Sequence, residues 1–149
     1  MPSVSSIHQL DRRPMSNDYS MTTLEPFLNV SNGPEAINFY KSAFGANVLF
    51  LIPPETGSTI AQLEISGATF WLADESPDHQ NPSPTTLQGS TVRIVLTVDD
   101  PDTLFNQAVA AGATVVWPIE DQDYGWRIGR VRDPFGHHWE IGKPLHSSS

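Results

Sequence analysis

Two carboxylates and one arginine mark the chemistry that this sequence offers. Glu25 and Arg93 each start a segment in which polar and apolar residues alternate, and Glu140 lies in the last such segment. Two neighbouring carboxylates perform acid–base catalysis when burial raises the pKa of one of them. A nearby arginine keeps both ionised, so Glu25 and Glu140 are interpreted as charged groups and no catalytic residue is assigned.

Aromatic and basic side chains indicate a second kind of chemistry, the binding of a ligand. An aromatic pocket would stack a planar or cationic molecule, and the alternative is ordinary packing. The candidates for this pocket are Phe27, Trp71, Tyr124 and Trp126. Arg130 and Arg132 share a strand face, where they contact either an anionic ligand or, as we expect, solvent along a charged edge strand.

An internal repeat supplies the elements that position these residues. Segments 27–48 and 95–115 share the same order of strand, turn, helix, glycine and second strand. A proline in the first helical turn, preceded by Asn32 or Asp100 as the N-cap, is typical of a helix start. Gly45 and Gly112 are typical of a helix end, because glycine adopts the left-handed conformation there at little cost.

Three strand-like runs follow each of the two predicted helices. They cover residues 47–52, 59–65 and 68–73 in the first copy, and residues 114–118, 126–132 and 137–142 in the second. Turn residues separate them. The predicted fold class is α+β, with two βαβββ modules that form a curved mixed sheet and carry their helices on the outside.

The composition of the chain sets the expected boundaries. The modules cover residues 22–75 and 90–145, joined by a linker, 76–89, that is rich in Pro, Ser, Thr and Asn. Residues 1–21 are expected to be a flexible extension, and residues 146–149 a short tail. Met15 and Met21 are alternative natural starts.

Alternation along the strands separates a core face from a mixed face, which lies against either solvent or a ligand cavity. The apolar set, expected under the helices, is Leu24, Pro26, Leu28 and Val30 in one strand and Val92, Ile94, Leu96 and Val98 in its repeat. The opposite, mixed faces carry Glu25, Phe27 and Asn29 in the first strand, and Arg93 and Val95 in the second. In the last strand His138 and Glu140 share the mixed face.

Composition excludes several classes of protein. The net charge of −9 argues against nucleic acid or an anionic membrane surface as a partner. The absence of cysteine excludes disulfides, thiolate metal sites and thiol nucleophiles. No apolar run is long enough for a spanning helix and no signal-like segment opens the chain, so a cytoplasmic location is expected.

Two motifs, in the right order within the repeat, resemble the vicinal oxygen chelate (glyoxalase/bleomycin resistance/dioxygenase) superfamily. The first is Phe39-Tyr40 followed by Phe44-Gly45, and the second is the run Asp133-Pro134-Phe135-Gly136-His137. They are most similar to the PhnB-like or bleomycin-resistance-like branch. The resemblance covers residues 22–145 and implies a fold built around a concave small-molecule site.

The resemblance also implies where a metal would be held. Metalloenzymes of this superfamily bind one divalent ion through the first and last strands of each module. The matching positions here are Glu25, Arg93, Glu140, and either Trp71 or Leu72. Arginine has no lone pair for a metal and the fourth position is apolar, so half of the ligand set is missing.

Two interpretations follow from this incomplete set. In the favoured one, Arg93 is the counter-ion of Glu25 and Glu140 in a buried polar cluster without metal. In the other, Glu25, His138 and Glu140 hold one divalent ion, which would be Mn, Fe, Ni, Zn or Mg. His137 does not join them, because adjacent strand residues point to opposite faces.

The predicted function is therefore a small-molecule-binding protein without a functional metal centre. It resembles drug-sequestering members of the superfamily and is expected to be a homodimer. The alternative is a metal-dependent lyase, isomerase or dioxygenase of the glyoxalase type, so whether the chain is an enzyme stays open. Fold alone does not separate the two, because function depends on the site.

Overall fold

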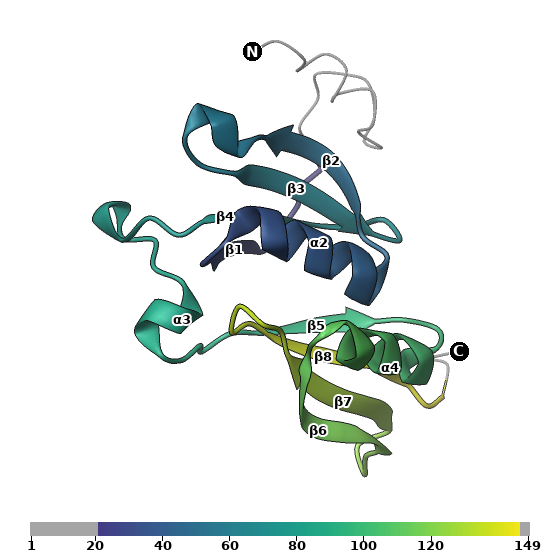
Figure 1. The fold of residues 1–149 in the computed structure, drawn as a ribbon. Coiled ribbons are helices and arrows are strands. Elements are labelled where there is room, and N and C mark those ends of the chain that lie inside the picture. The colour runs from purple at the N-terminus through teal and green to yellow at the C-terminus, as the bar shows by residue number, and fades with distance from the viewer. Residues whose placement is uncertain (1–20, 147–149) are drawn as a thin grey trace.

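Two four-stranded sheets, each with one long helix, make up the part of the chain that the structure describes. The computed structural model of the protein describes residues 21–146. The strand orders are β1-β4-β3-β2 and β5-β8-β7-β6 (Figure 1). The strands are β1 (Phe27–Val30), β2 (Asn47–Ile52), β3 (Ile60–Ile65), β4 (Ala68–Asp74), β5 (Arg93–Thr97), β6 (Thr114–Asp121), β7 (Trp126–Arg132) and β8 (His138–Pro144).

The two sheets have the same topology. β1 pairs with β4 in parallel, and β5 pairs with β8 in parallel, whereas the other pairs are antiparallel. Each sheet and its helix thus form one βαβββ module, so the predicted fold class is confirmed. The expected flexibility of residues 1–20 and 147–149 lies outside the described residues.

The helix boundaries follow the predicted signals. α2 (Gly33–Phe44) begins after Asn32, whose side chain accepts a hydrogen bond of 3.1 Å from the Glu35 N–H. α4 (Pro101–Ala111) begins after Asp100, which accepts from the Thr103 N–H at 3.2 Å. Gly45 ends α2 at a φ of 68°, a left-handed conformation that favours glycine.

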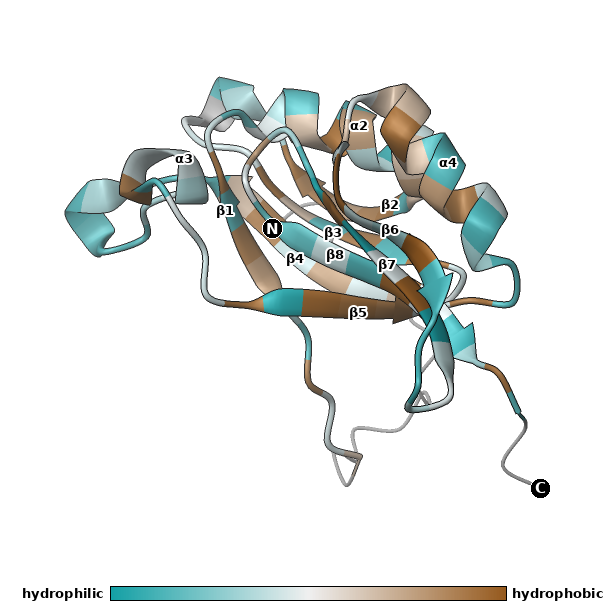
Figure 2. Cartoon of the chain, turned by 90° about the horizontal axis from the view of Figure 1, so that it is seen from below, coloured by the Kyte–Doolittle hydropathy of each residue, from teal (hydrophilic) through white to brown (hydrophobic). Residues whose placement is uncertain are grey.

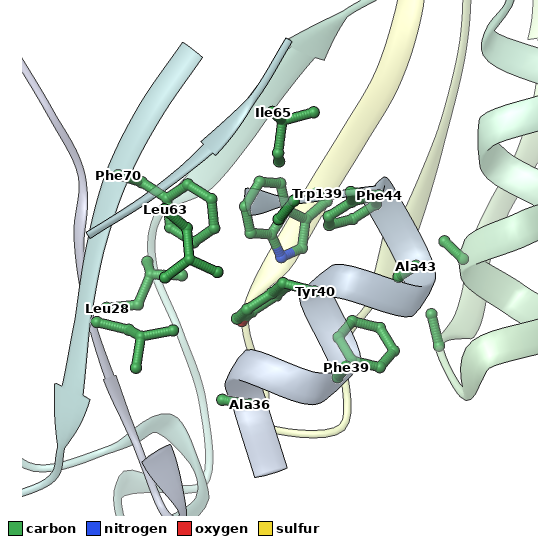
Figure 3. Packing of buried hydrophobic residues seen from close by; sticks show 14 of the residues in the cluster. Leu28, Ala36, Phe39, Tyr40, Ala43, Phe44, Leu63, Ile65, Phe70 and Trp139 are labelled. Carbon is green, nitrogen blue, oxygen red and sulfur yellow. The ribbon is translucent and has the colours of Figure 1, made fainter. Parts of the chain in front are cut away.

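The helices lie side by side on one side of the sheets (Figure 2). The apolar strand residues beneath them are buried, including Leu28, Val30, Leu96 and Ile141. Trp139 of β8 is also buried and packs against Tyr40 and Phe44 of α2 (Figure 3). The core of one module therefore continues into the other.

Two members of the predicted core set are not in the core. Leu24 is 97% exposed and Val92 is 66% exposed. Both precede the strands, because β1 begins at Phe27 and β5 begins at Arg93. Neither residue therefore lies beneath a helix.

Two strands are longer than predicted. β6 continues through Pro118 to Asp121, and β8 continues to Pro144. β6 is the edge strand of its sheet, and an edge strand tolerates proline because one side of its backbone needs no hydrogen-bond partner.

The segment between the modules is ordered, although its composition predicts a linker. It contains the short helices η2 (Pro77–His79) and α3 (Pro84–Leu87). Ser83 is fully buried, and its N–H donates to Glu75 Oε1 at 2.9 Å. The carbonyl of Pro82 accepts from Asn29 Nδ2 at 3.3 Å, which fastens the segment to β1.

Candidate functional site

The faces of the two sheets that carry no helix hold the candidate site residues, and each is called an open face below. On the first sheet, the register aligns Phe27, Trp71 and Gln62 across β1, β4 and β3, with Phe50 of β2 next to Gln62. On the second sheet, the equivalent row consists of Val95, Glu140, Arg130 and Trp117. Residues in one such row point to the same face.

Glu25 lies at the open face of the first sheet and is held by side chains of that sheet. Its carboxylate accepts hydrogen bonds from Gln62 Nε2 at 2.9 Å, from Trp71 Nε1 at 3.2 Å and from the hydroxyl of Thr69. These three donors are neutral, and they orient the carboxylate.

An aromatic row lies beside this carboxylate. The rings of Phe27 and Trp71 are stacked, with centroids 6.1 Å apart and an angle of 6° between their planes. The ring of Phe50 meets Trp71 edge to face at 5.8 Å. Phe27 is 54% exposed, so the row offers apolar surface on which a planar ring can stack.

Glu140 occupies the open face of the second sheet and is paired with two arginines. Its Oε2 accepts from Arg130 Nη2 at 2.8 Å and Nε at 3.1 Å, and from Arg93 Nη1 at 3.3 Å. The side chains of Arg130 and Glu140 are 20% and 19% exposed, whereas Arg93 is 59% exposed. Arg130 is therefore the better shielded and closer partner.

The expected cluster of Glu25, Arg93 and Glu140 is divided between the sheets. The pairing of Arg93 with Glu140 is confirmed, and Glu25 is bound by donors of the other sheet. The preferred interpretation of Arg130 as a solvated residue on an edge strand is wrong, because β7 lies between β6 and β8. The predicted ion pair of Arg93 with Glu25 is not among the contacts of the described residues, and Glu140 has Arg130 as a second arginine partner that the sequence did not predict.

His138 lies between two arginines on the same open face. The register pairs it with Arg132 of β7 on one side and with Arg93 of β5 on the other. Its Nδ1 is buried without a hydrogen-bond partner among the described residues. Burial, with Arg130 and Arg132 nearby, holds the pKa of His138 below its usual value of about 6.5.

The predicted aromatic pocket is divided in the same way. Phe27 and Trp71 lie on the first sheet, whereas Trp126 begins β7 on the second and Tyr124 is exposed in the turn before it. Asn29 binds the connecting segment through its side chain, and its carbonyl lies 2.9 Å from His137 Nε2. Asn29 therefore joins β1 to the connecting segment and to the turn before β8.

The four positions at which the resembled metalloenzymes hold an ion do not fit a metal here. The register identifies Trp71 as the equivalent of Glu140, since both pair with the matching residue of β1 or β5. Leu72 points to the helices and is fully buried. Trp71 and Arg93 have no lone pair to donate to a metal ion. The guanidinium groups of Arg93 and Arg130 both donate hydrogen bonds to the same oxygen of Glu140.

The alternative metal site, of Glu25, His138 and Glu140, is not assembled either. Among residues 21–146, no group of three or more His, Asp or Glu side chains is placed to hold an ion. Likewise, none of the described helices has the length and apolar character to cross a membrane.

Comparison with known proteins gives matches over most of the chain. The family model described as Glyoxalase/Bleomycin resistance protein/Dioxygenase superfamily matches residues 21–141. A Mycobacterium tuberculosis protein of uncharacterized function is 42% identical over 148 residues, covering 97% of this chain and 86% of the relative.

Solved structures agree with the fold. The chain is similar to TioX from Micromonospora sp. ML1, with 25% identity and a TM-score of 0.65, covering 84% of this chain and 100% of that one. It is also similar to a gene product from Arabidopsis thaliana, with 29% identity and a TM-score of 0.66, covering 83% and 99%. The PhnB-like or bleomycin-resistance-like branch stays a prediction.

Proposed function

Since the chain belongs to the glyoxalase/bleomycin resistance protein/dioxygenase superfamily, we propose that it binds a small molecule without a metal centre. The observation that carries this proposal is the pairing of Glu140 with Arg93 and Arg130 through one carboxylate oxygen. A divalent ion at this place would have to displace two cations that already neutralise the carboxylate. It would then meet both of them at short range, where like charges repel strongly.

The aromatic row of the first sheet is the surface that supports ligand binding most directly. Phe27, Trp71 and Phe50 offer stacked and edge-on rings beside the oriented carboxylate of Glu25. We propose that the ligand places a planar ring against Trp71, which removes exposed apolar surface from water.

A homodimer is part of the same proposal. Among the described residues, β1 and β5 each have one edge without a strand partner, and exposed apolar residues lie in or just before both strands. These residues are Leu24, Phe27, Val92 and Val95. A second copy would cover them and would enclose the open faces. The cytoplasm is the proposed location.

Metal analysis of the purified protein tests the proposal. After dialysis against Ni²⁺, Mn²⁺, Zn²⁺ or Fe²⁺ and removal of excess ion, elemental analysis should find no stoichiometric metal, and thermal unfolding should not shift. The variant Glu140→Gln and the control Glu55→Gln, at an exposed residue in the loop between β2 and β3, should behave alike. Stoichiometric metal that Glu140→Gln alone abolishes would favour the metal-dependent lyase, isomerase or dioxygenase.

Binding of a neutral planar probe tests the site itself. Saturation-transfer NMR with naphthalene-2-carboxamide should show ring contacts that Trp71→Leu removes. Trp117→Leu is the matched control, because Trp117 is an exposed tryptophan on the second sheet. Equal binding by the parent and Trp71→Leu would contradict the proposed surface. Light scattering across a dilution series measures the molar mass in solution and so tests whether the protein is a dimer.

A further inference from the structure

A row of basic side chains crosses the open face of the second sheet. Arg132, His138 and Arg93 are direct neighbours on β7, β8 and β5. Neighbouring strands are about 4.8 Å apart, so the two arginines lie two strand spacings from each other with His138 between them.

The adjacent row neutralises only part of this charge. Glu140 lies there and accepts from Arg93 and Arg130 through the same oxygen, Oε2. Arg132 has no ion pair with any residue of the described part of the chain. Of the three arginines on this face, only Arg93 and Arg130 are paired with Glu140, in a chain whose net charge is −9.

The first module shows that the fold does not require a basic row. At the equivalent places on the first sheet, Glu64 pairs with Thr69, and the hydroxyl of Thr69 donates to Glu25. The same geometry therefore carries acidic and neutral side chains in one module and basic ones in the other. The basic row is a property of this sequence, and it is open to solution at Arg93 and Arg132.

His138 adds a directed group to the row. Its Nδ1 is buried and has no partner among the described residues, so any contact between the ring and a ligand goes through Nε2. A ligand that accepts a hydrogen bond at Nε2 would fix the tautomer of the ring. Guanidinium groups on either side suit a carboxylate or phosphate, because their paired N–H donors match two oxygens.

We propose that the open face of the second sheet binds the oxyanion of a small ligand, a carboxylate or phosphate, between Arg93, His138 and Arg132. This inference rests on the proposed ligand-binding function and adds the chemical class of the ligand to it. The ligand is then a small acid, and the negative charge elsewhere on the chain disfavours its binding outside this site.

The test uses small anions on the intact protein at low ionic strength, where screening is weak. Inorganic phosphate and benzoate are titrated while NMR follows the His138 ring and the arginine Nε–Hε signals. We expect saturable shifts of His138 and Arg132, with a dissociation constant on the order of 1 mM. Benzamide, the neutral counterpart of benzoate, should not shift them, and the two anions distinguish a phosphate site from a carboxylate site.

Two variants that each lose one positive charge test whether the anion binds at the basic row. Arg132→Gln should weaken anion binding at least tenfold. Arg127→Gln, on the same strand, should leave it unchanged, because Arg127 is held by Asp102 at 2.8 Å and Asp121 at 2.9 Å. Equal losses in both variants, or shifts that never saturate, would overturn the inference.

A third variant separates this inference from the proposed function. Trp71→Leu should remove binding of the neutral planar probe and retain binding of phosphate. If the parent protein binds phosphate but does not bind the planar probe, the proposed aromatic surface alone is refuted. If the parent protein binds the planar probe but neither anion, the oxyanion site alone is refuted.

Discussion

The hydroxyl of Tyr40, on α2 of the first module, donates a hydrogen bond to Oδ2 of Asp133, in the turn between β7 and β8 of the second. The same oxygen accepts from Trp139 Nε1 at 2.9 Å. Oδ1 accepts from the N–H groups of Phe135 and His137 at 2.9 and 3.0 Å. One buried carboxylate therefore shapes its own turn and joins it to the other module.

Replacing Tyr40 tests the energy of this connection. Tyr40→Phe removes a buried hydrogen bond to a charged acceptor, and we expect the free energy of unfolding to fall by about 2 kcal/mol. Chemical denaturation measures it. Tyr124→Phe is the control, because Tyr124 is 70% exposed. Equal midpoints for Tyr40→Phe and the parent would show that the bond contributes little.

Tyr40 should also make the protein sensitive to alkali. Burial, together with the neighbouring charge of Asp133, raises the pKa of Tyr40 well above its ordinary value of about 10. Unfolding frees the phenol to ionise, so this contribution to stability is complete below about pH 10 and is lost as the pH rises further. Urea denaturation from pH 8 to 11 should show a steeper loss for the parent than for Tyr40→Phe. Parallel curves would contradict the assignment.

His138 should give a separate loss of stability on the acid side. Its pKa is lowered in the folded chain, so its contribution is complete above the unfolded value of about 6.5 and is lost as the pH falls through the folded value. The charged and titratable groups around its ring are Arg93, Arg130, Arg132, Asp133 and His137. Between pH 7 and 5, His138→Gln should lose less stability than the parent.

Phosphate provides the check on that acid-side effect. A bound anion favours protonated His138 and raises its pKa, so phosphate should reduce the difference between the parent and His138→Gln. An NMR titration of the His138 ring reads the pKa directly. A value at or above the ordinary one without phosphate would refute the expected shift.

Arg132 should lower the stability of the ligand-free protein. It shares the open face with Arg93 and Arg130 and has no ion pair of its own among the described residues, so Arg132→Gln removes repulsion between these guanidinium groups. We expect the free energy of unfolding to rise by about 0.2–1 kcal/mol at low salt, and less at high salt. Thermal unfolding at both salt concentrations measures this. A loss of stability would indicate a partner for Arg132 in the folded chain.

The two arginines that contact Glu140 should differ in their effects. Arg93 is mostly exposed and its contact is 3.3 Å, so Arg93→Ala should cost less than about 1 kcal/mol. Arg130 is well shielded and makes two shorter contacts, so Arg130→Ala should cost about 2–3 kcal/mol by leaving Glu140 poorly paired. Reversal of that order would contradict the geometry.

Local signals made the fold predictable from the sequence. The caps at Asn32 and Asp100 and the left-handed Gly45 depend on neighbours within a few residues, and the structure confirms them. Tyr40 and Asp133 belong to the two motifs, and their contact explains why the motifs occur together. Such short-range chemistry is readable without a structure.

The site was less predictable because its composition depends on strand register. A bulge between Val48 and Phe50 turns Phe50 from the helix side to the open face. A matching bulge between Val115 and Trp117 does the same for Trp117. Simple alternation assigns both aromatic residues to the wrong face, since an inserted residue reverses the parity. Arg130 was missed as a partner of Glu140 for the related reason that strand order is not local.

The ordered connection between the modules limits how the gene can be engineered. At Gly136, a Cβ would lie 2.6 Å from Pro84 Cβ, so the connection rests directly on the turn that Asp133 shapes. A reporter domain inserted beside Pro84 would disrupt this contact, although the Pro- and Ser-rich composition is typical of a linker that tolerates insertions. The loop at Gly57, where an added side chain would meet nothing within 4 Å, is the better place for an insertion or for new chain ends.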